Sequence, residues 1–225
     1  MSPGLLIVFE GSEGAGKTTQ VRMLAERLHA EGIEVVSLRE PGGTPLGDAI
    51  RSILLDPGQD ISPTSEALLF MASRAEIVRQ RIDPALARGV VVLMDRFFLS
   101  TYAYQIFGRG LPEAEIRTVN AFAVGARVPD LTLVLEVPAS EGMERATARG
   151  AQDRMEQSGE EFHNRVESAF TSFTDRDWQL AHPECGAITG VDGRGTAGEV
   201  HERVLDALAR KLPERFSMLS KVRAS

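Results

Sequence analysis

The sequence predicts an α/β fold in which helices cover both faces of a parallel sheet, with residues 1–225 forming a single domain. Two observations lead to this prediction. Short apolar runs, such as VVVLM at residues 90–94, alternate along the chain with longer segments whose apolar residues recur at helical spacing. No internal repeat or low-complexity tract interrupts this alternation. Strands that alternate with helices favour right-handed crossovers and therefore three layers, helix, sheet and helix.

The individual elements follow from local patterns. The first strand is expected at residues 5–10 (LLIVFE), and the first helix at residues 17–31, where Val21, Leu24 and Leu28 share one face and Gly32 ends the element. The VVVLM run is apolar throughout, which is typical of a central strand covered on both sides. The remaining strands are expected at residues 35–38, 131–137 and 187–191, and the remaining helices at residues 46–55, 65–87, up to about 124, up to about 149, 162–181 and 197–212.

Two segments fall outside this alternation. Residues 149–161 are short, polar and charged, and they stand between two expected helices, so we interpret them as a mobile lid. Residues 213–225 follow the last expected helix, and we expect this C-terminal tail to be frayed or disordered.

Composition limits the classes of partner. The formal net charge is −7, which argues against nucleic-acid binding through a basic surface. The single cysteine, Cys185, excludes an intrachain disulfide and favours a reducing compartment. The chain shows no basic region followed by an apolar run at its N-terminus, and its apolar stretches are too short to span a bilayer. We therefore expect a soluble, cytoplasmic protein with no nucleic-acid and no membrane partner.

The segment GSEGAGKTT, residues 11–19, matches the phosphate-binding pattern G-x-x-x-x-G-K-[ST] between an expected strand and an expected helix. Its glycines allow the backbone to turn with N–H groups pointing inward, because no Cβ blocks the phosphate oxygens. Lys17 supplies a positive charge for the β- and γ-phosphates, and Thr18 supplies an oxygen ligand for Mg²⁺. We therefore expect an ATP–Mg²⁺ site of the P-loop NTPase type. Its loop residues are Gly11, Ser12, Glu13, Gly14, Ala15, Gly16, Lys17, Thr18 and Thr19.

Such a loop serves either a switch or a transfer reaction. A GTP switch needs an Asn-Lys-x-Asp sequence to read guanine, and neither asparagine of the chain, Asn120 or Asn164, provides one. A transferase needs an acceptor pocket at the carboxyl ends of the strands. The expected third strand ends there in Asp95-Arg96, a carboxylate that can hold Mg²⁺ through water and a guanidinium that can bind phosphate. The pattern favours transfer.

Several segments together resemble bacterial thymidylate kinase, the enzyme that phosphorylates dTMP to dTDP. In order and spacing they are GSEGAGKTT, REPGGTPLGDAIRSILL, EALLFMASRAE, MDRFFLSTYAYQ, FGRG, RVPDLTLVLEV and RATARGAQDRME. The resemblance covers roughly residues 4–212. It implies a five-stranded parallel sheet of the nucleoside monophosphate kinase type, dependence on ATP and Mg²⁺, and a homodimer.

The resemblance also implies roles in the acceptor site. Arg51 and Arg96 match the arginines that hold the acceptor phosphate. Phe70 matches the ring that stacks on thymine, Arg74 the arginine that reads a base carbonyl, and Tyr104 a ring that would crowd a ribose 2′-hydroxyl. Glu40 and Pro41 match a loop whose Glu-Pro bond is often cis. The other residues that match the acceptor site are Glu13, Ser100, Thr101 and Gln105.

The resemblance further implies roles at the donor site and in catalysis. Arg149 matches the lid arginine that stabilises the transition state, a role worth about 10³ to 10⁵ in rate, together with Lys17, Arg96 and Asp95. Arg154 is a second lid cation at the ATP site, and Arg145 is expected to stack on adenine. Thr18, Asp95 and Glu13 are the expected Mg²⁺ ligands, partly through water. The sequence departs from the family at Phe97-Phe98, where a polar or tyrosine residue commonly comes first.

Two alternatives stay open at this point. The chain could prefer another nucleoside monophosphate, such as dUMP, or it could be a P-loop ATPase that regulates a protein partner.

Overall fold

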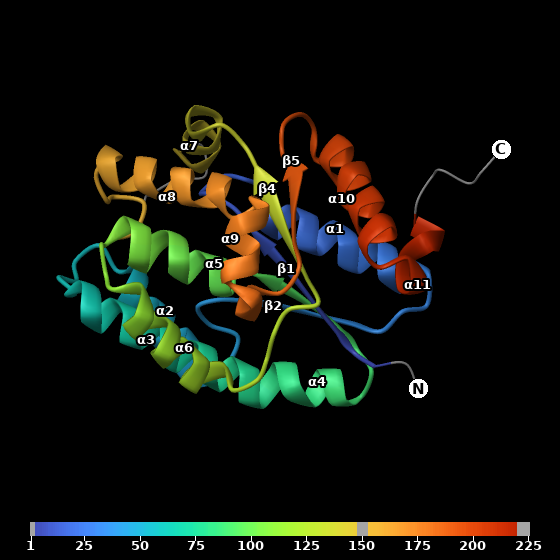
Figure 1. The fold of residues 1–225 in the computed structure, drawn as a ribbon, viewed down its shortest axis with the longest axis horizontal. Coiled ribbons are helices and arrows are strands. Elements are labelled where there is room, and N and C mark those ends of the chain that lie inside the picture. The colour runs from blue at the N-terminus through green and yellow to red at the C-terminus, as the bar shows by residue number, and fades with distance from the viewer. Residues whose placement is uncertain (1–2, 148–152, 220–225) are drawn as a thin grey trace.

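The five strands form one parallel sheet, as expected. The computed structural model describes residues 3–147 and 153–219. The order of the strands across the sheet is β2-β3-β1-β4-β5, and all four neighbouring pairs are parallel (Figure 1). The strands are β1 (Leu5–Glu10), β2 (Val35–Arg39), β3 (Val91–Asp95), β4 (Leu131–Glu136) and β5 (Ile188–Asp192).

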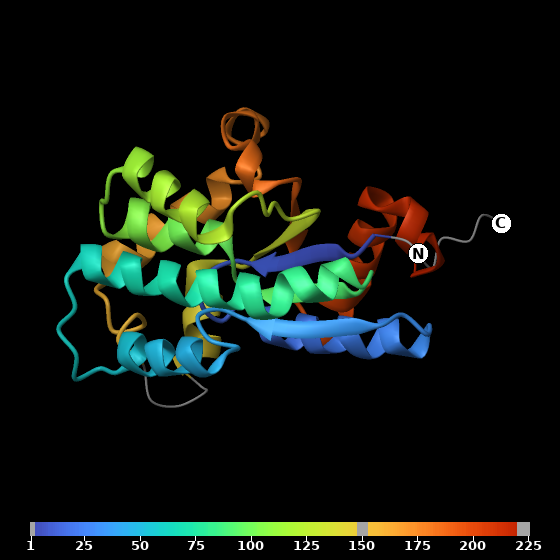
Figure 2. The same ribbon diagram turned by 90° about the horizontal axis from the view of Figure 1, so that it is seen from below.

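Helices cover both faces of the sheet and create two separate cores. On one face lie α1 (Lys17–Ala30), α10 (Ala197–Lys211) and α11 (Pro213–Phe216), and on the other lie α3 (Pro63–Ile77), α5 (Phe98–Thr101) and α8 (Glu160–Ser172), as Figures 1 and 2 show. The other α-helices are α2 (Pro45–Leu55), α4 (Asp83–Ala87), α6 (Glu113–Val124), α7 (Ala139–Thr147) and α9 (Arg176–Ala181). Short π-helical turns occupy Val78–Ile82 and Tyr102–Gly108, and 3₁₀ turns occupy Pro183–Cys185 and Ser217–Leu219.

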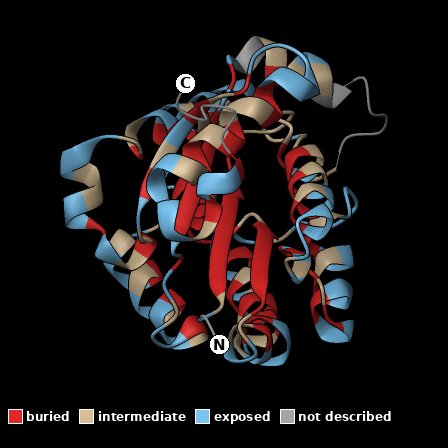
Figure 3. Ribbon diagram, turned by 90° about the vertical axis from the view of Figure 1, so that its right-hand side faces the viewer, coloured by how far each residue is buried: buried red, intermediate tan, exposed pale blue. Residues whose placement is uncertain are grey.

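The first strand shows why the chain needs both helical layers. Every residue of β1 is buried (Figure 3). Because side chains alternate along a strand, Leu5, Ile7 and Phe9 pack against α1 and α10, whereas Leu6 and Val8 pack against the opposite layer. A strand with two apolar faces is stable only between two layers, so the three-layer arrangement follows from the LLIVFE run.

The expected helix at residues 162–181 is wrong as a single element. It is two helices, α8 and α9, because α8 ends at Ser172 and Asp175 begins a new helix as its N-cap. The Asp175 carboxylate accepts hydrogen bonds from the backbone N–H groups of Asp177 (2.8 Å) and Trp178 (3.2 Å). These bonds satisfy donors that the start of a helix leaves free, which favours a break over continuation.

The expectation of a frayed tail is wrong for its first part. Residues 213–216 form α11 and residues 217–219 a 3₁₀ turn. Phe216 is fully buried and Leu219 is 2% exposed, both in the core that α1 and α10 share. The apolar side chains of this segment therefore complete a core. Residues 220–225 lie outside the described residues.

The order of the strands decides where a ligand can bind. From β1 the chain passes to β2 on one side of the sheet, whereas β4 and β5 lie on the other side. Such a reversal opens a crevice at the carboxyl ends of the strands, where α/β proteins of this type bind ligands. The phosphate loop after β1, the Glu40–Pro41 bond after β2 and the Asp95-Arg96 pair at the end of β3 all meet there. The Glu40–Pro41 bond is cis.

Candidate active site

The loop after β1 surrounds Lys17 with backbone oxygens. The Lys17 ammonium donates hydrogen bonds to the carbonyls of Gly11 (3.0 Å) and Ser12 (2.7 Å). Gly14 has a positive φ of 70°, and a Cβ there would lie 1.9 Å from the carbonyl oxygen of Gly142, so only glycine fits this turn. The glycine at this turn therefore fits the conformation that an anion-binding loop needs.

Burial makes the Lys17 charge sensitive to its surroundings. Burial, followed by repulsion from the Arg96 guanidinium, lowers the pKa of Lys17 to about 8, although Glu13 and Asp95 raise it. A phosphate anion beside Lys17 would stabilise its charged form, because an opposite charge offsets the cost of burying the ammonium.

Two oxygen groups at the mouth of the loop fit a magnesium ion. The hydroxyl of Thr18 donates a short hydrogen bond to the carboxylate of Asp95, which lies at the end of β3. Mg²⁺ is bound in such sites by one or two protein oxygens together with phosphate oxygens and water. Within the described residues no cluster of three or more metal-binding side chains exists. The available donors therefore suit an ion that arrives with a nucleotide.

Arg96 occupies the centre of the site in a constrained backbone conformation. Among the described residues it is the one non-glycine residue with positive φ, at 72°. Its guanidinium donates to Glu13 (Nη2–Oε1 2.6 Å), Ser100 (Nη1–Oγ 3.0 Å) and Tyr104 (Nη2–Oη 3.2 Å). Burial lowers the pKa of Arg96, but attraction to Glu13 and to other neighbouring groups raises it by more, so the net shift is upward. Such a conformation costs of order 1–3 kcal/mol and is common at functional sites.

Glu10 holds this conformation in place. It is fully buried at the end of β1, and its carboxylate accepts hydrogen bonds from the backbone N–H groups of Phe97 (2.7 Å) and Ser100 (3.0 Å) and from the Ser100 hydroxyl (2.7 Å). Sequence reasoning missed this residue. A charged residue at the end of an apolar strand was the available signal, because a buried carboxylate needs donors from elsewhere in the fold.

Arg74 is buried and paired entirely within the protein. Its Nε and Nη2 atoms contact Oε2 of Glu40 (2.8 and 2.7 Å), and Nη1 donates to Thr101 (2.7 Å) and Asn120 (2.8 Å). Nη2 also donates to the carbonyl of Phe97 (2.9 Å). These bonds use all five N–H groups, so a direct hydrogen bond from Arg74 to a base would require an exchange of partners.

The region behind Arg74 explains the unusual Phe97-Phe98 pair. Both rings are buried, and they pack edge to face with centroids 4.7 Å apart. The Arg74 guanidinium lies 5.2 Å from the Phe97 centroid and 5.8 Å from the Phe98 centroid, close enough for cation–π attraction. The two rings therefore support Arg74 from behind, and neither of them lines the cavity in front of it.

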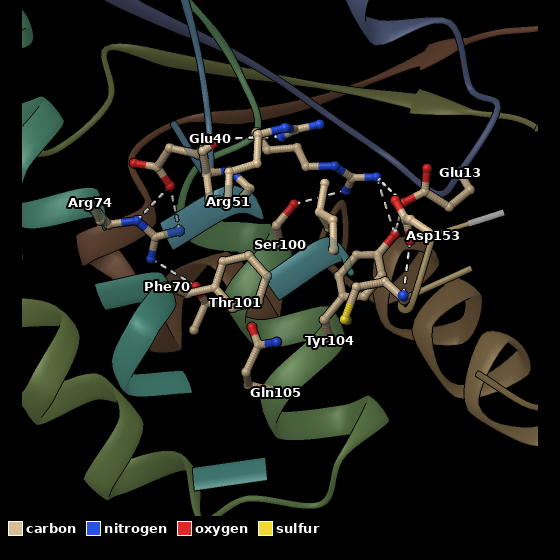
Figure 4. Close-up of a pocket in the computed structure, with 14 residues that line it drawn as sticks. Glu13, Glu40, Arg51, Phe70, Arg74, Ser100, Thr101, Tyr104, Gln105 and Asp153 are labelled. Carbon is tan, nitrogen blue, oxygen red and sulfur yellow. Dashed lines mark hydrogen bonds and ion pairs between the residues drawn. The ribbon is translucent and has the colours of Figure 1, made fainter. Parts of the chain in front are cut away.

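A cavity opens in front of these residues (Figure 4). Its lining combines the apolar side chains of Leu55, Phe70 and Met155 with polar and charged side chains, so we call it half-apolar. One buried polar atom in it, Oε1 of Glu40, has no hydrogen-bond partner. Burial raises the pKa of Glu40, whereas Arg74 lowers it, and the net shift is upward. An unpaired atom of this kind indicates a site completed by a ligand or water.

A second cavity extends over the phosphate loop to α10. Residues 13–19 line it, whereas Gly11 and Ser12 contribute the carbonyls that hold Lys17. Arg145 lies at its far end, where it pairs with Glu141 and donates to the carbonyl of Gly193 (3.2 Å). The two cavities share five lining residues, Glu13, Glu40, Arg51, Arg96 and Asp153, so a ligand in one faces a ligand in the other.

All of the expected acceptor residues line the first cavity. They are Glu13, Glu40, Pro41, Arg51, Phe70, Arg74, Arg96, Ser100, Thr101, Tyr104 and Gln105. The sequence analysis missed further residues that line either cavity, Arg39, Leu55, Asp153, Met155 and Glu156. They lie in segments that the sequence analysis singled out, but nothing local distinguished these side chains, because their neighbours in space are distant in sequence.

The structure does not bring Arg154 to the ATP cavity. Its Nε donates to the carbonyl of Leu54 (2.7 Å), and its Nη2 lies 2.8 Å from Oε2 of the buried Glu66. Its backbone N–H donates to the carbonyl of Leu55 (3.1 Å). Arg154 therefore fastens the beginning of the expected lid to the end of α2. Arg149 lies outside the described residues.

Comparisons with known proteins agree with this geometry. Residues 9–181 match the family model of thymidylate kinase. The thymidylate kinase of Pseudomonas fluorescens (strain SBW25) is 54% identical over 168 residues, which cover 74% of this chain and 80% of that protein. The thymidylate kinase of Deinococcus radiodurans is 43% identical over 211 residues, 94% of this chain and 99% of that one. The crystal structure of thymidylate kinase from Ehrlichia chaffeensis superposes with a TM-score of 0.71 at 30% identity, covering 92% of this chain and 99% of that chain.

Proposed function

The chain belongs to the thymidylate kinase family, and from this membership we propose that its two cavities transfer the γ-phosphoryl group of ATP to the 5′-phosphate of dTMP. It is a nucleoside monophosphate kinase, a phosphotransferase. The strongest support for assigning ATP and dTMP to the two cavities is one observation. The phosphate-loop cavity and the half-apolar cavity share a wall that contains Arg51 and Arg96, where two phosphate ends would meet.

In this proposal dTMP binds in the half-apolar cavity. Phe70 stacks on thymine, and the phosphate lies between Arg51 and Arg96. Arg51 donates to the carbonyl of Pro41 (3.1 Å), which directs it toward this place. The ring of Tyr104 lines this cavity and in this proposal would crowd a ribose 2′-hydroxyl, which favours a deoxynucleotide.

Catalysis in this proposal consists of positioning and charge neutralisation. Lys17 and Arg96 balance the charge that develops on the oxygens of the transferring group. Thr18 and Asp95 would hold Mg²⁺ with Glu13 nearby, and the ion would supply further positive charge at the phosphates. No dedicated general base is needed, because the acceptor phosphate is already ionised.

We assign the lid role to the segment 149–161 as a whole. Its described part lies against the acceptor cavity, since Asp153 and Met155 line that cavity. Asp153 caps the turn by accepting hydrogen bonds from the backbone N–H groups of Met155 and Glu156 (both 2.9 Å). The proposed transition-state role of Arg149 is consistent with a segment anchored beside both cavities.

We also propose that the protein is a homodimer that acts in the cytoplasm. Three helices that pack side by side, α2, α3 and α6, carry large exposed apolar side chains: Ile53 is 47% exposed, Leu68 52% and Phe122 91% (Figure 1). A concentration of exposed apolar groups in one layer is typical of an interface. Among the described residues, no helix has the length and apolarity needed to cross a membrane.

Chromatography with light scattering tests the dimer. We expect Phe122→Asp to yield a monomer, because a carboxylate would be buried without a partner at the interface. Leu180→Asp, at a 70% exposed position on α9, is the matched control and should leave the dimer intact. A monomeric wild type would contradict the proposal.

The function itself is tested by comparing acceptors. We expect turnover with dTMP to exceed that with dUMP, dGMP and CMP, and equal rates would contradict the assignment of a thymine site. ATP hydrolysis without an acceptor separates the kinase from a regulatory ATPase. Rapid hydrolysis that dTMP leaves unchanged would favour the ATPase.

A further inference from the structure

A buried carboxylate lies beneath the acceptor cavity, and none of the roles described so far uses it. Glu66, in the first turn of α3, has no exposed surface. Its Oε2 contacts the guanidinium nitrogens of Arg109 (3.0 Å) and Arg154 (2.8 Å). Its Oε1 accepts hydrogen bonds from Gln105 (Nε2, 3.0 Å) and Arg109 (Nε, 3.2 Å). Two cations and an amide thus compensate a charge that would otherwise be costly to bury.

This contact fixes the orientation of the Gln105 amide. An ionised carboxylate only accepts hydrogen bonds, so the amide must present its NH₂ group to Glu66. The reversed amide would place two oxygens in contact. Gln105 lines the acceptor cavity, where Figure 4 shows its side chain below Thr101. Among the described residues no donor reaches its Oε1, which is therefore available to accept a hydrogen bond from a ligand.

The neighbouring hydroxyl has the opposite polarity. Arg74 donates to Oγ1 of Thr101 (2.7 Å), so this oxygen already accepts a hydrogen bond from a charged donor. Asn120 and Glu40 hold the guanidinium in place (2.8 Å to each). The hydroxyl hydrogen of Thr101 is left to donate, and the described part of the chain offers it no acceptor. The cavity thus presents a donor at Thr101 beside an acceptor at Gln105.

We propose that Glu66 is a positioning residue that selects the base of the acceptor nucleotide through Gln105. The proposal rests on the proposed function, because it concerns the same acceptor cavity. Thymine and uracil carry a carbonyl that accepts beside an N–H that donates, which matches Thr101 and Gln105. Cytosine carries an amino group that donates beside a ring nitrogen that accepts, so both of its contacts would be mismatched. Selection against cytosine then originates in a carboxylate that does not touch the base.

The test compares kcat/KM for dTMP and dCMP in the full-length enzyme. In Glu66→Gln the new amide can donate to Gln105 and allow it to turn over. We expect the ratio of dTMP to dCMP efficiency to fall by about 10-fold or more, because a site that mispairs a buried polar group discriminates strongly. The KM for ATP should not change. Glu66→Asp retains a group that only accepts, and it should keep most of the discrimination.

Glu184→Gln is the matched control. Its carboxylate also pairs with an arginine, Arg117, and accepts a hydrogen bond from Tyr102, but neither of these partners lines the cavity, whereas Gln105, the partner of Glu66, does. We expect the ratio of dTMP to dCMP efficiency in Glu184→Gln to equal that of the wild type. An unchanged ratio in Glu66→Gln, or an equal loss in Glu66→Asp, would overturn the proposal.

If Glu66→Gln does not fold, Gln105→Met gives the same information. This substitution removes the Oε1 acceptor of Gln105 directly, so the ratio of dTMP to dCMP efficiency should fall. An unchanged ratio would overturn the proposal. The wild-type enzyme separates the two levels of inference. If it phosphorylates dTMP while Glu66→Gln keeps its selectivity, the role of Glu66 fails and the kinase function stands. If the wild type does not use dTMP, the proposed function fails.

Discussion

The donor and acceptor halves of the site are built in different ways. The donor half is a local structure in which one loop and the first turn of α1 supply the glycines, Lys17 and Thr18. The acceptor half collects side chains from the turn after β2, from α2 and α3, and from the turns and helices after β3. In the proposed function the loop backbone and Lys17 of the donor half hold ATP, whereas in the acceptor half buried ion pairs hold the side chains that line the cavity. Removal of a side chain should therefore cost activity in the donor half and stability or selectivity in the acceptor half.

The largest expected effect belongs to the donor half. Lys17→Met should lower kcat/KM by about 10³-fold, because a preorganised charge at the transferring phosphate is lost. Its stability should change little, since burial already disfavours the Lys17 charge. Steady-state kinetics together with thermal denaturation would show both effects. If Lys17→Met unfolds at a much lower temperature than the wild type, the donor half also depends on its side chains for stability, and the two halves do not differ in this way.

The next effect belongs to the acceptor half. Arg74→Met should lower the free energy of unfolding by about 3–5 kcal/mol, because it leaves the Glu40 carboxylate buried without its partner. Urea denaturation measures this quantity. The double variant Arg74→Met/Glu40→Gln should recover part of the loss, since the unpaired charge is then absent. An equally unstable double variant would indicate that packing, and not charge, holds this half together.

The smallest effect is a pH dependence confined to the donor half. Lys17 is protonated below its pKa of about 8, so affinity for ATP should be constant there. Above pH 8 binding must take up a proton, and affinity should fall by up to about tenfold per pH unit. The same shift makes the folded state more stable as pH rises from about 8 toward the ordinary value of 10.5, so unfolding through Lys17 does not explain the loss. Calorimetric titration with ATP at several pH values tests this, with dTMP as the comparison ligand.

The sequence predicted the two halves from different signals. The loop of the donor half is contiguous, so spacing alone made Lys17, Thr18 and the glycines candidates, whereas the candidates of the acceptor half came from the family resemblance. Arg154 was expected at the ATP site but pairs with Glu66, which contacts Gln105 of the acceptor cavity. A glutamate in the first turn of a helix usually stabilises the helix dipole at the surface, and nothing local reveals that Glu66 is buried.

In the fold, too, features that depend on neighbouring residues were predicted, and features that depend on residues distant in the sequence were missed. Strands and most helices could be predicted from periodicity, because the apolar residues that form their buried faces are close together in the sequence. The break at Asp175 was missed, although aspartate is a common N-cap. The burial of Phe216 depends on a core formed by α1 and α10, far away in sequence, so the tail looked unstructured.

The wall common to both cavities has a consequence for inhibitor design. Since Glu13, Arg51 and Arg96 border each cavity, a single compound with a nucleoside at either end of a phosphate chain would fill both at once. Once its first end is bound, the tether keeps the second end at an effective concentration in the millimolar range, so such a compound should bind far more tightly than either half alone.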